Sequence, residues 1–200
     1  MGLTKQAKIL SNKQIKLVLL HLSTTRNPIR NRVIFLLSVK SGFRAKEIAS
    51  LQWKMLMNSN GEMMNEIHLT NTASKGKSSG RVITIHKELK KSLDELYEQV
   101  SNKKSFDVAS SYVITTERSN HTSAQAIVNT FQKWYLELGF IGASSHSGRR
   151  TFITNVAKKI SAVGGSMRDV QSLAGHSNLQ TTQRYIEVDT QSQQKVIEVI

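Results

Sequence analysis

The sequence predicts an α+β fold that is mostly α-helical and carries one small antiparallel β-sheet with a hairpin. Two observations lead to this expectation. Charged residues alternate with apolar ones in the manner of packed helices, and helix start and stop signals bound these stretches. In the first half of the chain, only two short runs of residues have the composition of strands, and a stretch of Ser, Lys and Gly joins them. A length of 200 residues is that of one ordinary domain, so we expect a single catalytic or binding domain over residues 1–200.

Two helices are predicted in the first part of the chain. Ser11 with Gln14 three residues later is a capping-box pattern, in which each side chain bonds the backbone N–H of the other residue. This pattern predicts a helix that runs to about Leu22. Pro28 marks the start of a second helix, because proline is tolerated at the first helical position, and Gly42 marks its end.

The later elements follow from the same signals. A short helix is expected over 44–52. The runs Glu66–Thr70 and Arg81–His86 are predicted to pair through a hairpin with a basic tip in Thr72–Gly80, and one more short strand is expected near Tyr112–Thr115. Further helices are predicted at about 87–101, 122–138, 149–160, 167–174, 179–186 and 191–200.

The charge balance is strongly basic. The chain holds 28 Lys+Arg against 14 Asp+Glu, with a formal net charge of +14 and a pI near 10.1. Residues 1–61 contain 11 basic side chains and a single acid, Glu47. Such an excess favours a polyanionic partner, with nucleic acid ahead of an anionic membrane surface. A solvated helix face would carry the same charge, but the interleaved apolar residues argue against a disordered basic tail.

Composition also excludes several classes of protein. Cysteine is absent, which rules out thiolate catalysis, a disulfide framework and a cysteine zinc site. The six histidines show no metal-ligand spacing and no Gly-rich phosphate loop occurs, so we expect neither a metal nor another cofactor. The N-terminus lacks the apolar core of a signal peptide, and no run approaches the roughly 18 apolar residues of a membrane helix. A cytoplasmic protein without membrane contact is therefore expected.

Five separated stretches carry reactive side chains. They are GFRAKEI at 42–48, SKGK at 74–77, HSGRR at 146–150, LAGHS at 173–177 and TTQRY at 181–185. Taken singly, each has an ordinary explanation as a surface cation, a core or helix-terminal histidine, or a tyrosine at the edge of the core.

Together, in this order and spacing, the five stretches resemble the catalytic domain of the tyrosine recombinase (phage integrase) family. The family pattern is G-x-R-x-x-E, a hairpin lysine, H-x-x-R, and G-H followed by a tyrosine nine residues after that histidine. Here His176 and Tyr185 are nine residues apart. The resemblance covers about residues 10–188. The chain departs from the family at Gly148 and Arg150, where the family often has Leu and His.

The resemblance implies site-specific DNA recombination by tyrosine transesterification. Tyr185 would attack a phosphodiester, form a 3′-phosphotyrosine and free a 5′-hydroxyl, so that religation needs no ATP. The transition state places added negative charge on the non-bridging oxygens, which need permanently charged planar donors. Arg44 and Arg149 fit that requirement.

The remaining roles also come from the resemblance. His146 would assist at the phenol, Lys75 would donate a proton to the leaving oxygen, and His176 would hydrogen-bond the scissile phosphate. Glu47, three residues past Arg44 on the same helical face, would brace that arginine. The predicted DNA contacts are Lys46, Lys77, Arg81 and Arg150, with Lys77 also the reserve candidate for the role of Lys75. Arg150 is alternatively an ordinary cation on a helix face.

The resemblance further implies double-stranded DNA as the partner and a homo-oligomer on it, a tetramer in the synapse. Residues 189–200 would form a C-terminal tail that docks on a neighbouring protomer or packs within its own chain. No N-terminal core-binding domain is expected, because the catalytic pattern begins within about ten residues of Met1.

Two other functions are compatible with the same residues. One is relaxation of a single duplex in the manner of a type IB topoisomerase, and the other is a catalytically silent basic DNA-binding regulator. The G-H-S-x-x-x-x-T-x-x-Y layout favours the recombinase over the topoisomerase. A protein that only binds DNA has no use for a tyrosine at that spacing.

Overall fold

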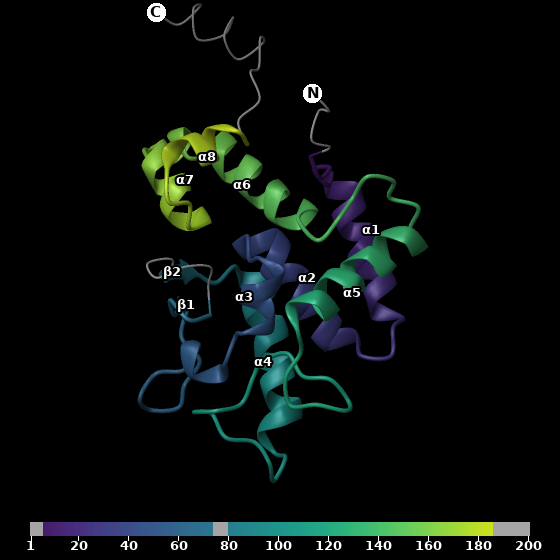
Figure 1. Ribbon diagram of the computed structural model, residues 1–200. Helices are drawn as coiled ribbons and strands as arrows, with labels where there is room; N and C mark the ends of the chain where they lie inside the picture. The colour runs from purple at the N-terminus through teal and green to yellow at the C-terminus, as the bar shows by residue number, and fades with distance from the viewer. Residues whose placement is uncertain (1–5, 74–79, 186–200) are drawn as a thin grey trace, which may run out of the picture.

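The computed structural model describes residues 6–73 and 80–185. Helices dominate this part of the chain, and one two-stranded antiparallel sheet lies at its side (Figure 1). The predicted fold class is confirmed. The helices are α1 (Asn12–Ser23), α2 (Pro28–Ser41), α3 (Ala45–Ala49), α4 (Lys87–Ser101), α5 (Ala124–Glu137), α6 (Ser147–Lys159), α7 (Met167–Ala174) and α8 (Leu179–Gln183); the strands are β1 (Glu66–Leu69) and β2 (Arg81–Thr84); and 3₁₀ turns occur at Trp53–Met55 and Ser161–Val163.

The local signals act as the sequence predicts. Ser11 and Gln14 form the reciprocal capping box that opens α1. Pro28 begins α2, and Gly42 ends it with a φ of 67°, in the left-handed region that favours glycine. A Cβ at Gly42 would also lie 2.5 Å from the ring of Phe152 on α6, so both the backbone and the space require glycine here.

Some boundaries and one element differ from the expectation. The helix predicted over 44–52 ends at Ala49, and the helix predicted over 179–186 ends at Gln183. The strand expected near Tyr112–Thr115 is wrong: Tyr112 makes only an isolated bridge with Gln52. The partner segment turns into a 3₁₀ helix at Trp53, so no ladder can extend along it. The predicted helix at 191–200 and the predicted docking tail lie outside the described residues.

Helix α2 forms the centre of the molecule and packs against both α4 and α6 (Figure 1). Every side chain from Val33 to Val39 is buried, which is why α2 shows little difference between its faces. The main core also contains the large buried rings of Trp53 and Phe131. This apolar core is the base on which the elements of the site rest.

The contact between α2 and α6 explains one departure from the family pattern. A Cβ at Gly148 on α6 would collide with the hydroxyl and Cβ of Ser38 on α2. Glycine therefore allows the two helices to approach closely. Because Arg149 is the next residue, this approach also sets the depth at which its side chain enters the molecule.

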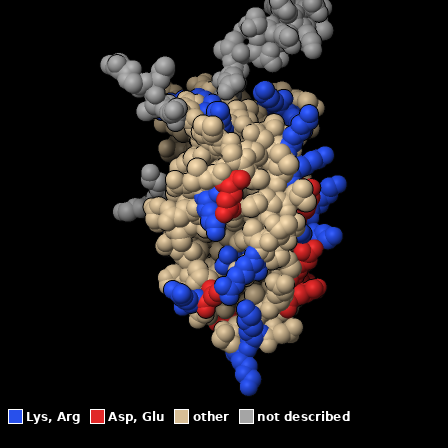
Figure 2. All heavy atoms as spheres, turned by 90° about the vertical axis from the view of Figure 1, so that its right-hand side faces the viewer, with Lys and Arg blue, Asp and Glu red and all other residues tan. Residues whose placement is uncertain are grey.

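Two further observations bear on partners. Figure 2 shows the side of the molecule that carries α1 and α5, where basic side chains lie among acidic ones and broad uncharged areas. This mixture is typical of an ordinary solvated surface. Within residues 6–73 and 80–185, the helices are all too short or too polar to cross a membrane.

Candidate active site

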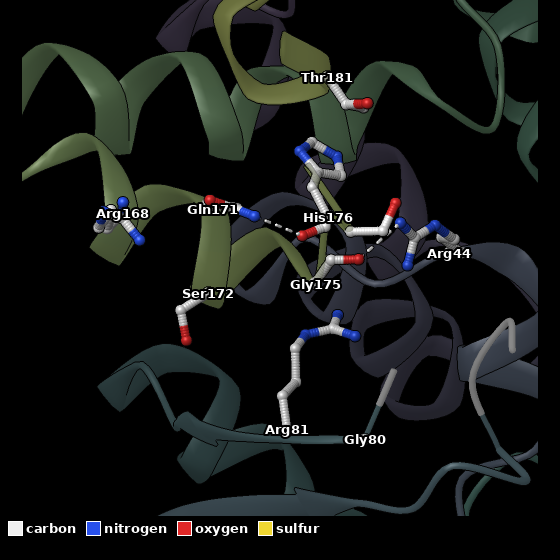
Figure 3. A pocket seen from close by; sticks show the side chains of 10 residues that line it. Arg44, Gly80, Arg81, Arg168, Gln171, Ser172, Gly175, His176 and Thr181 are labelled. Carbon is white, nitrogen blue, oxygen red and sulfur yellow. Dashed lines mark hydrogen bonds between the residues drawn. The ribbon is translucent and has the colours of Figure 1, made fainter. Parts of the chain in front are cut away.

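A pocket of about 740 Å³ opens between the α7–α8 region and the segments that carry α3 and β2. Figure 3 shows the side chains that line it, with Arg44, Arg81 and His176 grouped at one end and Arg168 at the other. These residues come from three separate stretches of the chain: Arg44, Gly80–Arg81 and Arg168–Thr181. Polar and positively charged groups dominate the lining, which suits an anionic ligand.

Glu47 lies beneath the pocket and organises two of the arginines. Its side chain is fully buried, and its carboxylate accepts four hydrogen bonds. Arg44 contributes its Nη1 at 2.9 Å and its backbone N–H at 2.8 Å, and Arg81 contributes Nη1 at 2.9 Å and Nη2 at 3.1 Å. Burial alone would raise the pKa of Glu47, but the bonds and charges of Arg81 and Arg44 outweigh it and lower that pKa.

Arg44 begins α3 and reaches into the pocket. Besides its bond to Glu47, its Nη2 donates to the backbone oxygen of Gly175 at 3.3 Å. A quarter of the side chain is exposed, whereas that of Arg81 is only 6% exposed. Arg44 is therefore the more accessible of the two arginines that share Glu47, and it can donate to a bound anion.

Arg149 on α6 is almost fully buried. Its guanidinium donates to the backbone oxygens of Gly42 and Ala174 and, at 2.9 Å, to Nε2 of His176. Burial lowers the pKa of Arg149 to about 10, helped by the positive charge of Arg44. The group remains charged at neutral pH, and its contacts hold it in one orientation.

The hydrogen bonds of His176 determine its protonation. Because arginine only donates, Nε2 of His176 must accept the bond from Arg149, and the ring proton must lie on Nδ1. Nδ1 lies 3.0 Å from the hydroxyl oxygen of Thr182, which can accept a hydrogen bond from Nδ1–H. Burial, followed by the charges of Arg149 and Arg44, lowers the pKa of His176 to about 4. The imidazole is therefore neutral at pH 7.

Tyr185 lies directly against this cluster. Its ring stacks on the imidazole of His176 with the centroids 5.4 Å apart and the planes 24° apart. Its backbone oxygen accepts a bond from Thr154 on α6 at 3.2 Å. The tyrosine therefore reaches the arginine–histidine cluster of its own chain.

The other predicted site residues have different positions. His146 is the exposed residue before α6, with Nδ1 3.5 Å from the hydroxyl of Ser145, and it is not among the residues that line the pocket. Lys46 is exposed on α3. Lys75 and Lys77 lie outside the described residues.

Two arginines predicted as DNA contacts have partners within the protein. Arg81 is bound to Glu47, as described above, and its Nε donates to the backbone oxygen of Leu173 at 3.1 Å. Arg150 donates to the backbone oxygen of Ala7 at 2.9 Å and so holds the N-terminal segment against α6. The prediction of DNA contacts rested on basic side-chain type, which does not reveal an intramolecular partner.

Sequence reasoning assigned no role to three polar residues near the site. Thr182 can accept a hydrogen bond from Nδ1–H of His176, Gln171 donates to the His176 backbone oxygen at 3.0 Å, and Arg168 lines the pocket. Thr182 is the threonine of the G-H-S-x-x-x-x-T-x-x-Y layout, whereas for Gln171 and Arg168 the available signal was their position on the helix before the Gly175–His176 dipeptide. Within the described ranges, no group of three or more acidic or histidine side chains could hold a metal ion.

Comparisons with known proteins identify the family. The model of the phage integrase family matches residues 8–192. Tyrosine recombinase XerC of Lactobacillus leichmannii is 32% identical over 169 residues, which cover 82% of this chain and 52% of that protein. Tyrosine recombinase XerA of Thermococcus kodakarensis is 26% identical over 196 residues, 96% of this chain and 62% of that protein. The chain thus spans little more than half the length of these curated relatives.

Solved structures show the same fold. A crystal structure of XerA recombinase has a TM-score of 0.73 at 18% identity and covers 98% of this chain and 64% of that one. The pre-cleavage complex of XerH recombinase with its difH substrate has a TM-score of 0.70 at 17% identity, and the match covers 100% of this chain and 56% of that one. At such identities the likeness concerns the fold alone, but the family model matches nearly the whole sequence, and the chain therefore belongs to the phage integrase family.

Proposed function

We propose that this chain catalyses site-specific recombination of double-stranded DNA in the cytoplasm, with Tyr185 as the nucleophile. The observation that carries the proposal is the stacking of Tyr185 on His176, which is itself bonded to Arg149. A nucleophile and a fixed positive charge thus lie in one site, with Arg44 accessible in the adjoining pocket. Membership of the phage integrase family supports the same chemistry.

In the proposed step the phenolate oxygen of Tyr185 attacks the scissile phosphorus. A Tyr–O–P bond forms and the bond to the 5′-oxygen breaks, so a phosphodiester is exchanged for a phosphodiester and no ATP is consumed. Arg44 and Arg149 stabilise the negative charge on the non-bridging oxygens. The reverse attack by a 5′-hydroxyl from a second strand completes the exchange.

Two protons must move during this step. A free phenol has a pKa of about 10, so its ionisation at pH 7 costs about 4 kcal/mol unless a base assists. We assign that assistance to His146 and the protonation of the leaving 5′-oxygen to Lys75, with Lys77 as the alternative donor. Lys46 is assigned to DNA binding. The proposed transesterification needs no metal ion.

The proposal includes assembly on DNA. One relative by fold was solved as a lambda integrase dimer bound to a core site, and XerH was solved bound to difH. We propose that this chain acts as a single catalytic domain that assembles into a tetramer on two DNA sites, with residues 189–200 contributing to the contact between protomers.

A covalent-trapping experiment tests the proposal. The protein is incubated with a pool of nicked suicide duplexes with a randomised core, and SDS-resistant protein–DNA adducts are counted. Tyr185→Phe should abolish the adduct, whereas Tyr112→Phe, at the isolated bridge to Gln52, should leave it unchanged. An adduct formed by Tyr185→Phe would show that the nucleophile is misassigned.

The same assay separates the alternatives. Wild-type protein that binds the duplexes without forming any adduct would be a silent regulator. An adduct accompanied by relaxation of supercoiled DNA without exchange between duplexes would indicate topoisomerase-like activity. Cleavage should survive EDTA, and strict dependence on Mg²⁺ would point to a metal nuclease instead.

A further inference from the structure

Arg81 makes more contacts than any other charged side chain at the edge of the pocket. Its Nε donates to the backbone oxygen of Leu173 at the end of α7, and its two Nη atoms donate to the two oxygens of Glu47. Its guanidinium also lies 5.7 Å from the ring centroid of Phe43. Figure 3 shows the side chain rising from β2 toward Gly175. One residue thus connects the strand, α3 and the end of α7.

The sharing of Glu47 limits what Arg44 can do. Carboxylates favour paired, bidentate contact with a single guanidinium. Here Arg81 binds both oxygens of Glu47, while Arg44 reaches only Oε1 with its side chain and Oε2 with its backbone N–H. The Nη2 of Arg44 remains on the pocket side, with only a 3.3 Å bond to Gly175.

Arg81 also sets the approach of the segment that carries His176. A Cβ at Gly175 would lie 2.8 Å from Nη1 of Arg81, so the glycine lets the backbone pack directly against the guanidinium. Gly175 has a φ of 60° and ends α7. The position of the Gly175–His176 dipeptide therefore depends on Arg81 as well as on Arg149.

We infer that Arg81 is a positioning residue: by occupying both oxygens of Glu47, it keeps the guanidinium of Arg44 directed into the pocket, where the scissile phosphate binds. This inference rests on the proposed function. Without Arg81, Arg44 would turn to bind both oxygens of Glu47 and would withdraw a donor from the phosphate. Arg81 itself would contact no phosphate.

Kinetics with Arg81→Met and Arg81→Lys test this role. At saturating DNA, Arg81→Met should form the covalent adduct about tenfold more slowly or worse, since misorienting one catalytic donor has effects of at least this size. DNA affinity and its salt dependence should stay within about twofold of wild type, because Arg81 itself contacts no phosphate and the reoriented Arg44 keeps its charge beside the pocket. Arg81→Lys, which retains the charge, should recover part of the rate.

Other roles for Arg81 predict different results. A direct DNA contact predicts weaker binding and a salt slope reduced by about one, with little change in the rate at saturation. A purely structural role predicts a lower melting temperature with an unchanged adduct rate at temperatures where the variant is folded. Either result would overturn the inference. The matched control is Arg26→Met, which removes an exposed ion pair with Glu117 and should change none of these quantities.

A second measurement does not depend on cleavage. The ¹⁵N-labelled Nε–Hε signal of Arg44, identified by its loss in Arg44→Lys, should shift in Arg81→Met and in Arg81→Lys but not in Arg26→Met. An unchanged Arg44 signal in folded Arg81 variants would refute the inference. If the wild type forms no adduct but the signal shifts, the proposed function fails and the positioning of Arg44 by Arg81 stands.

Discussion

The two hydrophobic clusters formed by residues 6–73 and 80–185 are held together in different ways. The main core combines α1 to α5 with the sheet and buries many large apolar side chains, among them Phe35 and Trp53. In the smaller cluster, around α6 and α7, the buried apolar members among the described residues are Ile153, Val170 and Ala174. Apolar burial is non-directional, so it stabilises the main core without fixing the angle of any one group.

The smaller cluster is tied to the main core by directional polar contacts. Arg149 donates to the backbone oxygens of Gly42 and Ala174, and Arg81 donates to that of Leu173. Such bonds constrain distance and angle and are costly to leave unmade when buried. The main core therefore supplies stability, and the polar contacts supply the geometry of the site.

The largest effect is expected at Arg149. Arg149→Ala removes a catalytic donor and should slow adduct formation by about a thousandfold, the order found for the loss of a preorganised anion donor. The free energy of unfolding should fall by only about 1 to 3 kcal/mol, from the carbonyl groups left unpaired. Quenched-time adduct assays and urea unfolding measure the two quantities. If Arg149→Ala lowered the free energy of unfolding by more than it raised the activation free energy of adduct formation, the polar contacts would serve stability more than the geometry of the site, contrary to this view.

The reverse pattern is expected in the main core. Phe35→Ala should lower the free energy of unfolding by about 3 to 5 kcal/mol, because it removes a fully buried ring and leaves a cavity. Adduct formation should be nearly unchanged at temperatures where the variant is folded. Urea unfolding and the trapping assay give both numbers, and a selective loss of the adduct rate would show that the two regions are coupled.

The pH dependence of stability should report on the polar contacts around His176. The pKa of His176 is lowered to about 4, whereas an unfolded histidine titrates near 6.5. The unfolded state therefore binds the extra proton first, so stability is fully present above pH 6.5 and is lost as the pH falls toward 4. The loss should not exceed about 3 kcal/mol. Urea unfolding from pH 7 to pH 4 measures it.

A histidine variant separates this contribution from others. His176→Asn should flatten the pH dependence, because it removes the group whose pKa differs between the folded and unfolded states. Equal slopes in the wild type and His176→Asn would show that another group is responsible.

The smallest effect is expected at Thr182. Thr182→Val keeps the shape of the side chain but removes the acceptor for Nδ1–H of His176. The loss should be about 1 kcal/mol in stability and about tenfold in adduct rate, since the Nδ1–H loses its acceptor and the imidazole is then oriented by its bond to Arg149 without this second restraint. Thr130→Val on α5, which removes a bond to the backbone oxygen of Ala126, should affect only stability.

Much of the fold was predictable because its signals are local. The capping box at Ser11 and the stop at Gly42 operate within one or two helical turns, and they appear where expected. The strand predicted near Tyr112 failed because pairing depends on a partner far away in the sequence, which turns away at Trp53. Composition cannot report such a partner.

The sequence by itself determined the reactive groups, their order and the spacing between His176 and Tyr185, since these are properties of the chain. Only the tertiary structure decided how they are held: Glu47 is shared between Arg44, three residues away, and Arg81, 34 residues away. The tautomer of His176 likewise follows from its contact with Arg149 on another helix. Hydrogen bonds and ionisation depend on distance in space, and the packing of distant segments sets that distance.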